Sequence, residues 1–118
     1  MRPEPADLEL VGAAVAALRR GLGPELHPRA AAVRTSAGRV VTGLGLGAAC
    51  AEPVAVGAAL ALGERVVTLA AVRHVDADAT RVTTPCAGCR TVLRQHAPGV
   101  RVLLLADGLR VRTLAELT

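Results

Sequence analysis

The chain has 118 residues, 52% of them hydrophobic, and a formal net charge of +4. This length accommodates one domain, residues 1–118, and charges or glycines interrupt every apolar run before the roughly 18 residues of a membrane span. The fourteen basic residues are all arginine and are scattered along the chain, and there is no Phe, Tyr or Trp to stack on nucleic acid bases. We therefore expect neither a membrane nor a nucleic acid as a partner.

The N-terminal segment 1–10 favours a cytoplasmic location. It contains prolines and acidic residues where a secretory signal has an apolar run. In a reducing compartment, three cysteines are more typical of metal binding or catalysis than of disulfides.

The first part of the chain predicts a helix followed by a hairpin. Apolar residues recur at helical spacing over 7–20, with Asp7 as its cap. Two β-prone runs follow at 30–35 and 39–42, and the Ser-Ala-Gly segment between them indicates a turn. The glycine-rich segment 43–47 predicts the end of a strand and a further turn rather than a phosphate loop, because no Lys follows in the required register.

The rest of the chain alternates between helices and strands. The predicted elements are a buried helix from about 50 to 62, an apolar strand at 66–72, a polar loop at 74–84, a helix at 85–96, a buried strand at 100–105 and a possible last strand at 109–112. This order predicts an α/β fold with a mixed central sheet of about five strands flanked by helices. The continuous apolar strand 66–72 belongs in the middle of that sheet.

All three cysteines lie at predicted helix starts. Cys50 comes at the start of one helix, and Cys86 and Cys89 lie in the first turn of the next. A Cys-x-x-Cys pair there places two sulfurs on the same side, and a helix N-terminus favours their thiolate forms. Three thiolates leave one position of a tetrahedral metal open, which is the arrangement of a catalytic zinc site.

Glu52 follows the first cysteine by two residues. Its carboxylate is close enough to reach a water on the metal without binding the metal itself, so it is the candidate proton shuttle. Three cysteine ligands, a glutamate that is not a ligand and a Pro-Cys-x-x-Cys segment form the pattern of the zinc deaminases.

Cys50-Ala51-Glu52 together with the segment 85–90, Pro-Cys-Ala-Gly-Cys-Arg, resembles the cytidine deaminase superfamily in its small tetrameric branch. Residues 51–60 and 90–100 are especially similar to the blasticidin S deaminases, and the resemblance extends from about residue 29 to 117. It implies a three-layer cytidine deaminase-like fold, a bound Zn²⁺ and a homotetramer. It also implies hydrolysis of a cyclic amidine C–N bond, with release of ammonia from a cytosine-like ring.

The resemblance also implies roles for individual residues. Glu52 would take a proton from water, protonate the ring nitrogen and help the amine leave, while the backbone of Ala51 and the carbonyl of Thr84 would contact the base. Arg90 would offset the negative charge of the three thiolates. In the segment before Cys50, cytidine deaminases carry an Asn and a Glu that hold the ribose hydroxyls, whereas this chain has the glycine-rich segment 43–49. Gly45 is the candidate substrate contact in this segment, and the substrate preference is expected to differ there. The expected substrate is a cytidine-like nucleoside, blasticidin S or another small amino-heterocycle.

Other interpretations of the cysteines stay open. A structural zinc would need a fourth ligand, and the candidates His27, His74 and His96 all lie away from the helix starts. A redox Cys-x-x-Cys pair would leave Cys50 and Glu52 without a purpose. A further alternative is a zinc-containing protein of deaminase fold that has lost its activity and serves as a binding or structural protein. The intact Glu52 favours the enzyme, whereas the missing aromatic and ribose-binding residues favour this alternative.

Overall fold

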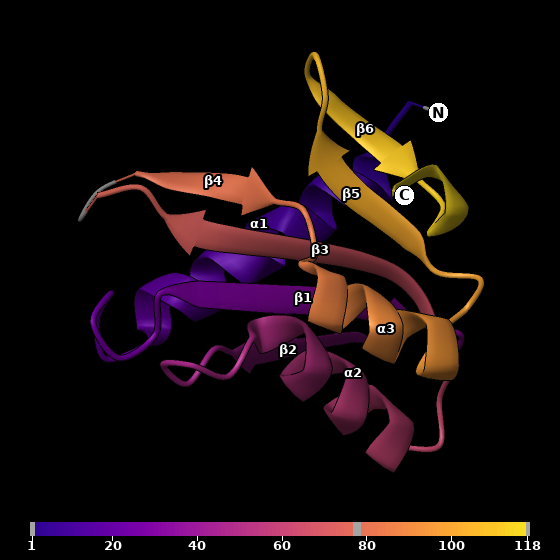
Figure 1. Ribbon diagram of the computed structural model, residues 1–118, viewed down its shortest axis with the longest axis horizontal. Coiled ribbons are helices and arrows are strands. Elements are labelled where there is room, and N and C mark those ends of the chain that lie inside the picture. Colours follow the sequence, from indigo (N-terminus) through magenta and orange to yellow (C-terminus); the bar gives the residue numbers. More distant parts are fainter. Residues whose placement is uncertain (1, 77–78, 118) are drawn as a thin grey trace.

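The computed structural model describes residues 2–76 and 79–117, which form one mixed β-sheet with helices on both faces (Figure 1). In chain order the elements are α1 (Pro5–Arg20), β1 (Arg29–Thr35), β2 (Val40–Leu44), α2 (Ala51–Ala61), β3 (Val66–His74), β4 (Thr80–Thr83), α3 (Ala87–His96), β5 (Arg101–Leu105), β6 (Leu109–Arg112) and the short 3-10 helix η1 (Ala115–Leu117). The predicted fold class is confirmed. Among the described helices, none is both long and apolar enough to cross a membrane.

The sheet is built around β3. Its strand order is β2-β1-β3-β5-β6, with β4 also paired to β3. β1 runs antiparallel to both β2 and β3, whereas β5 runs parallel to β3 and pairs with its first half at Thr68 and Leu69. The apolar run 66–72 therefore lies in the middle of the sheet, as its continuous hydrophobicity predicted.

The prediction of a polar loop over 74–84 is wrong. β3 continues to His74, and β4 pairs antiparallel with its second half, in a register that joins Ala71 to Thr83 and His74 to Thr80. β4 covers the edge of β3 that the short β5 leaves open, so its backbone groups find hydrogen-bond partners there. The sheet consequently has six strands rather than about five. Residues 77–78 of the expected loop lie outside the described residues.

Helix α1 covers one face of the sheet, and α2 and α3 cover the other (Figure 1). Side chains alternate between these layers, because successive strand residues point to opposite faces. In β1, Ala31 and Val33 pack with α2 and α3, whereas Ala30 and Ala32 pack with α1. The small side chains of Ala30, Ala31 and Ala32 let the helix backbones on both faces approach the sheet closely.

Helix α1 is joined to the sheet by a buried carboxylate. The helix begins at Pro5, two residues before the predicted start, because Glu4 is its N-cap and Asp7 closes a capping box. Arg101 of β5 donates two hydrogen bonds to the Asp7 carboxylate, of 3.0 and 3.1 Å. Burial raises the pKa of Asp7, but the hydrogen bonds from Arg101 and from the Glu4 backbone lower it further than burial raises it.

Helix α2 depends on a glycine in the sheet beneath it. A Cβ on Gly43 of β2 would lie 2.7 Å from Ala55 N and 2.9 Å from Val54 Cγ1. Substitution Gly43→Ala is expected to lower the free energy of unfolding by about 1–3 kcal/mol, the usual cost of overpacking. Urea denaturation measures this effect.

The matched control is Gly12→Ala on α1, where nothing lies within 4 Å of an added Cβ. This variant is expected to gain about 0.5–1 kcal/mol, because alanine favours a helix over glycine. Equal stability of Gly43→Ala and the wild-type protein would contradict the close packing of α2 on β2.

Candidate metal centre and active site

The three thiols meet where the N-termini of α2 and α3 come together. Cys50 is the N-cap of α2 and Cys86 is the N-cap of α3, with Cys89 in the first turn of α3. The Cys86 sulfur accepts a hydrogen bond of 3.4 Å from the backbone N–H of Cys89. All three sulfurs lie within 4.8 Å of one another, and those of Cys50 and Cys86 are 3.9 Å apart. The sequence prediction that these residues form one cluster agrees with this geometry.

The spacing of the sulfurs fits a single zinc ion. Sulfurs that bind one tetrahedral zinc at about 2.3 Å lie about 3.8 Å from one another. The cysteines are free thiols, and their burial ranges from exposed Cys86 through half-buried Cys50 to buried Cys89. Among the described residues, no His, Asp or Glu joins the cluster. Three soft donors without a fourth protein ligand are the set expected of a catalytic rather than a structural site.

The surroundings act differently on two of the thiols. The backbone N–H of Cys89 lowers the pKa of Cys86, because it stabilises the thiolate at the helix start. Burial raises the pKa of Cys89, and the negative charge of Glu52 raises it further. A cation among the sulfurs favours the deprotonated forms. The donor set is thus suited to a divalent metal ion.

Glu52 lies in the first turn of α2, where an acidic residue also complements the helix dipole. Its side chain is 1% exposed, and in the described part of the chain its Oε1 atom has no hydrogen-bond partner. A buried carboxylate oxygen without a partner costs stability, and such groups are typical of functional sites. The Thr83 hydroxyl, at the end of β4, is buried in the same way. Thr83 was not predicted as a site residue, because the sequence indicated a loop where the structure has strand β4.

The predicted substrate contacts lie around the start of α2 and the end of β4. Gly45 follows β2 and lies against the start of α2, since an added Cβ there would be 3.6 Å from Ala51 N. Ala51 is fully buried, and Thr84 is exposed directly after β4. Arg90 donates a hydrogen bond of 2.9 Å to the carbonyl of Pro85, next to Cys86. The structure thus brings Gly45 to Ala51 and attaches Arg90 to the segment before α3, while their roles stay predictions.

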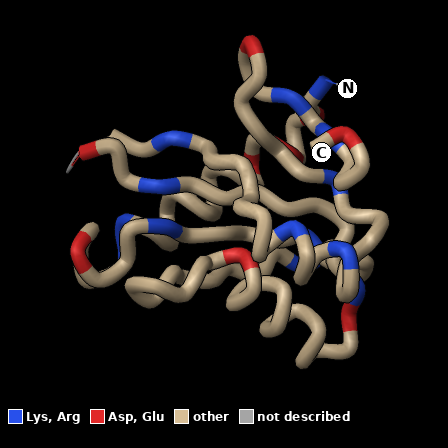
Figure 2. The backbone as a smooth tube through the Cα atoms, viewed as in Figure 1, with Lys and Arg blue, Asp and Glu red and all other residues tan. Residues whose placement is uncertain are grey.

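A hollow of about 320 Å³ adjoins the cluster. Its lining consists of Pro28, Arg29, Gly45, Gly47, Ala48, Ala49 and Cys50. His27 lies beside it, with its Nδ1 atom 3.1 Å from the carbonyl oxygen of Gly45. Basic segments of β1, β3 and β4 lie side by side at this end of the sheet (Figure 2). The sequence did not place His27 or Arg29 beside the cysteines, because only the folded hairpin brings them near.

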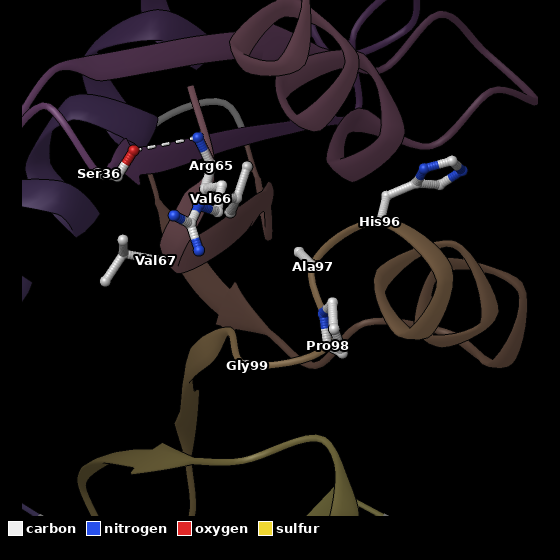
Figure 3. A pocket seen from close by; sticks show the side chains of 8 residues that line it. All are labelled: Ser36, Arg65, Val66, Val67, His96, Ala97, Pro98 and Gly99. Carbon is white, nitrogen blue, oxygen red and sulfur yellow. Dashed lines mark hydrogen bonds between the residues drawn. The ribbon is translucent and has the colours of Figure 1, made fainter. Parts of the chain in front are cut away.

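A second hollow, of about 330 Å³, lies at the other end of α3. Its lining comes from the turn after β1, the start of β3 with the residue before it, and the end of α3 with the segment after it. The lining residues are Ser36, Arg65, Val66, Val67, His96, Ala97, Pro98 and Gly99 (Figure 3). It contains none of the cysteines and no carboxylate. The chemistry therefore belongs to the hollow beside Cys50.

The histidines lie outside the metal cluster. His74 is the last residue of β3 rather than part of a loop, and both of its ring nitrogens are buried without a partner in the described part of the chain. Alternation along β3 places it on the same face as Val72, which packs with α1. His96, at the end of α3, is exposed.

No family model matches the chain. Its structure is similar to that of the cytidine deaminase from Mycobacterium leprae, with a TM-score of 0.72, 27% identity and 98% of each chain covered. Its sequence is 33% identical over 121 residues to the Blasticidin-S deaminase of Bacillus cereus, a match that covers 93% of this chain and 86% of that protein. The chain belongs to the cytidine deaminase-like superfamily. The cytidine deaminase from Bacillus anthracis, 19% identical with a TM-score of 0.79 over 94% of this chain and 85% of that one, shares the fold of this deaminase-like protein.

The sulfur cluster of this cytidine deaminase-like protein makes metal content a direct test. We expect about one zinc per chain in the wild-type protein and almost none in Cys86→Ser. This substitution removes one of the three sulfur ligands, and the two that remain bind the metal too weakly to retain it. Elemental analysis of the purified proteins measures the stoichiometry.

Gly88→Ala is the matched control. It changes the same helix turn but keeps all three sulfurs, and its added Cβ would lie at an ordinary contact distance of 3.9 Å from the Cys86 sulfur. It is expected to retain zinc. Full zinc content in Cys86→Ser would show that the metal binds elsewhere.

Proposed function

We propose that this protein is a zinc-dependent hydrolytic deaminase that releases ammonia from a small amino-heterocycle of the cytidine type. The observation that carries the proposal is one constellation at the meeting point of two helices. Three thiols lie within 4.8 Å of one another. The first turn of α2, whose N-cap is Cys50, carries a buried carboxylate, and one of its oxygens has no hydrogen-bond partner among the described residues. Membership of a superfamily of deaminases supports the same reaction.

Cys50, Cys86 and Cys89 would hold the zinc. Zinc bound there supplies a Lewis acid that makes a water molecule more acidic. The protein's own contribution is to keep the three sulfurs at the helix starts and to leave the fourth position free of protein ligands. Because Cys86 is exposed, solvent and substrate would reach a metal held by these residues.

Glu52 would move the protons. Hydrolysis adds water to the ring carbon that carries the amino group, breaks the C–N bond and leaves a carbonyl group and ammonia. Glu52 Oε1 accepts one proton from the water and delivers it to the ring nitrogen as the water oxygen bonds to the ring carbon. Glu52 then moves the remaining proton of that oxygen to the amine, so that the C–N bond breaks, the carbonyl forms and ammonia leaves. Because the carboxylate is buried, few waters compete for its protons.

The neighbouring residues would orient the substrate. The backbone at Ala51 and Gly45 and the carbonyl of Thr84 are the proposed contacts for the heterocycle. Gly45 itself packs closely against the backbone, since an added Cβ would lie 3.2 Å from Ala49 O and 3.3 Å from Arg29 O. Arg90 is a positioning residue in this scheme, since its bond to the Pro85 carbonyl fixes the segment that carries Cys86. The positive charge of Arg90 would also offset the negative charge of the three thiolates.

A binding protein that keeps the fold without activity is the second candidate. The absence of any aromatic residue favours it, because the hollow beside Cys50 has no ring on which a heterocycle stacks. The buried Glu52 favours the enzyme, because a protein with only structural needs gains nothing from an unpartnered buried carboxylate. Ammonia release separates the two candidates.

The decisive assay measures ammonia from zinc-loaded protein mixed with cytidine, deoxycytidine, cytosine, blasticidin S, and amino-substituted purines and pterins. Turnover of a cytidine-like member establishes the proposed reaction and its substrate class. Zinc-loaded protein that turns over no compound in this panel would favour the binding role.

Glu52→Gln is expected to lower kcat by about 100-fold to 10,000-fold, the usual range for loss of a general acid and base. Its zinc content is expected to stay unchanged, because Glu52 does not belong to the donor cluster. Ammonia assays and elemental analysis on the same sample measure both effects. Glu9→Gln, the same change at an exposed position of α1, is the control. Full turnover in Glu52→Gln would overturn the assigned role.

A homo-oligomer, as the family resemblance predicts, is also part of this proposal. The described surface of α2 supports it, because Val54 and Leu60 of this helix are each 38% exposed and its C-cap, Leu62, is 53% exposed. Apolar side chains on one helix are typical of an interface between subunits. Light scattering of the purified protein is expected to give the mass of a tetramer, and the mass of a monomer would contradict the prediction.

A further inference from the structure

Three arginines form a row across the sheet beside the proposed active site. Arg29 of β1 pairs with Arg73 of β3, and Arg73 pairs with Arg81 of β4. The three residues therefore occupy equivalent positions on neighbouring strands. Figure 2 shows the basic segments of these strands one above another at the same end of the sheet. We call this set the arginine row.

The arginine row faces the same side of the sheet as α2 and α3. Ala31 and Ala71 pack in the apolar cluster beneath these helices, and each lies two residues from Arg29 or Arg73 along its strand. Residues two apart in a strand share a face. Thr83 pairs with Ala71, so Arg81, two residues before it, lies on that face as well. The row is thus on the side of the sheet that carries the cysteines.

One end of the row, Arg29, borders the hollow beside the metal cluster. Arg29 lines this hollow together with Gly45 and Cys50, and it is the one basic side chain in the lining. Apart from Pro28 and Cys50, the rest of the described lining is glycine and alanine, whose side chains offer neither charge nor a hydrogen bond. A substrate that fills this hollow with its amino group at the cysteines therefore meets Arg29, one end of the row.

The charges of the row are not balanced within the described part of the chain. Arg34, Arg39 and Arg101 each form an ion pair with a carboxylate. In contrast, the guanidiniums of the arginine row have neither a hydrogen bond nor an ion pair among the residues that the structure describes. Arg29 and Arg73 are half-buried, so solvent screens their repulsion incompletely. Like charges placed opposite one another in a sheet are unfavourable, and a bound anion relieves that repulsion.

We propose that the arginine row binds an anionic substituent of the substrate, a carboxylate or a phosphate attached to the amino-heterocycle. This inference rests on the proposed deaminase function and names a substrate class for it. Guanidinium groups bind both anions through paired N–H donors, which gives orientation as well as affinity. The row then fixes the far end of the substrate while its amino group lies near the cysteines and Glu52.

The test compares neutral and anionic compounds that share one heterocycle. Cytidine is paired with cytidine 5′-monophosphate, and cytosine is paired with cytosine-1-acetic acid, so that the phosphate and the carboxylate are distinguished. Zinc-loaded protein is assayed for ammonia release, and binding of each compound and of inorganic phosphate is measured by calorimetry. We expect at least one anionic member to exceed its neutral partner by about tenfold or more in both kcat/KM and affinity.

Arg73→Gln removes the central charge of the row and is expected to abolish this preference. Arg94→Gln is the matched control, because it removes the same charge from the exposed surface of α3, where Arg94 bonds to Thr91. Thermal unfolding of both variants shows that they are folded. Arg29→Gln and Arg81→Gln, at the two ends of the row, provide further variants should Arg73→Gln fail to fold.

The outcomes distinguish this inference from the proposed function. Equal binding and turnover of neutral and anionic compounds, with Arg73→Gln like Arg94→Gln, would overturn the anion site and leave the deaminase intact. Tight binding of an anionic compound that depends on Arg73, without ammonia from any compound, would support the anion site and count against the deaminase.

Discussion

The site depends on the meeting of two helix N-termini at one point. A helix start presents unpaired N–H groups and a partial positive charge, and both stabilise a thiolate. In this protein, cysteines serve as the N-caps of α2 and α3, so the residues that begin the helices are also the proposed metal donors. The same residues therefore begin the two helices and form the donor set. Glu52, in the first turn after Cys50, is buried by the same arrangement.

The sheet makes this meeting possible. α2 lies on β1 and β2 across small residues, and Gly43 allows the closest approach. β3 brings β5 parallel to its first half and β4 antiparallel to its second half. After β4 the chain passes through Thr84 and Pro85 and enters α3. The short β4 thus determines where Cys86 lies relative to Cys50.

The sequence predicted the helices, the central strand and the cysteine cluster, because each depends on local spacing. Hydrophobic periodicity and turn residues located α1 and the β1–β2 hairpin, and the Pro-Cys-x-x-Cys segment located the start of α3. The strand β4 was missed, because its short run of Thr, Arg and Val lies in a polar stretch and gains its partners only from the open edge of β3. The arginine row was missed for the same reason. Arg29, Arg73 and Arg81 are far apart in sequence, and only the register of three strands brings them together.

The absence of aromatic rings has a practical consequence for work on this protein. With no Trp, Tyr or Phe in the chain, the polypeptide contributes almost no absorption in the near ultraviolet, where pyrimidines and purines absorb strongly. In a complex of this protein with a substrate, near-ultraviolet absorption therefore comes from the heterocycle. A bound metal adds to it only if that metal has a charge-transfer band with the thiolates in this region. The state of a ligand in the hollow beside Cys50 can therefore be followed directly by its own spectrum, without a label and without a background from the protein.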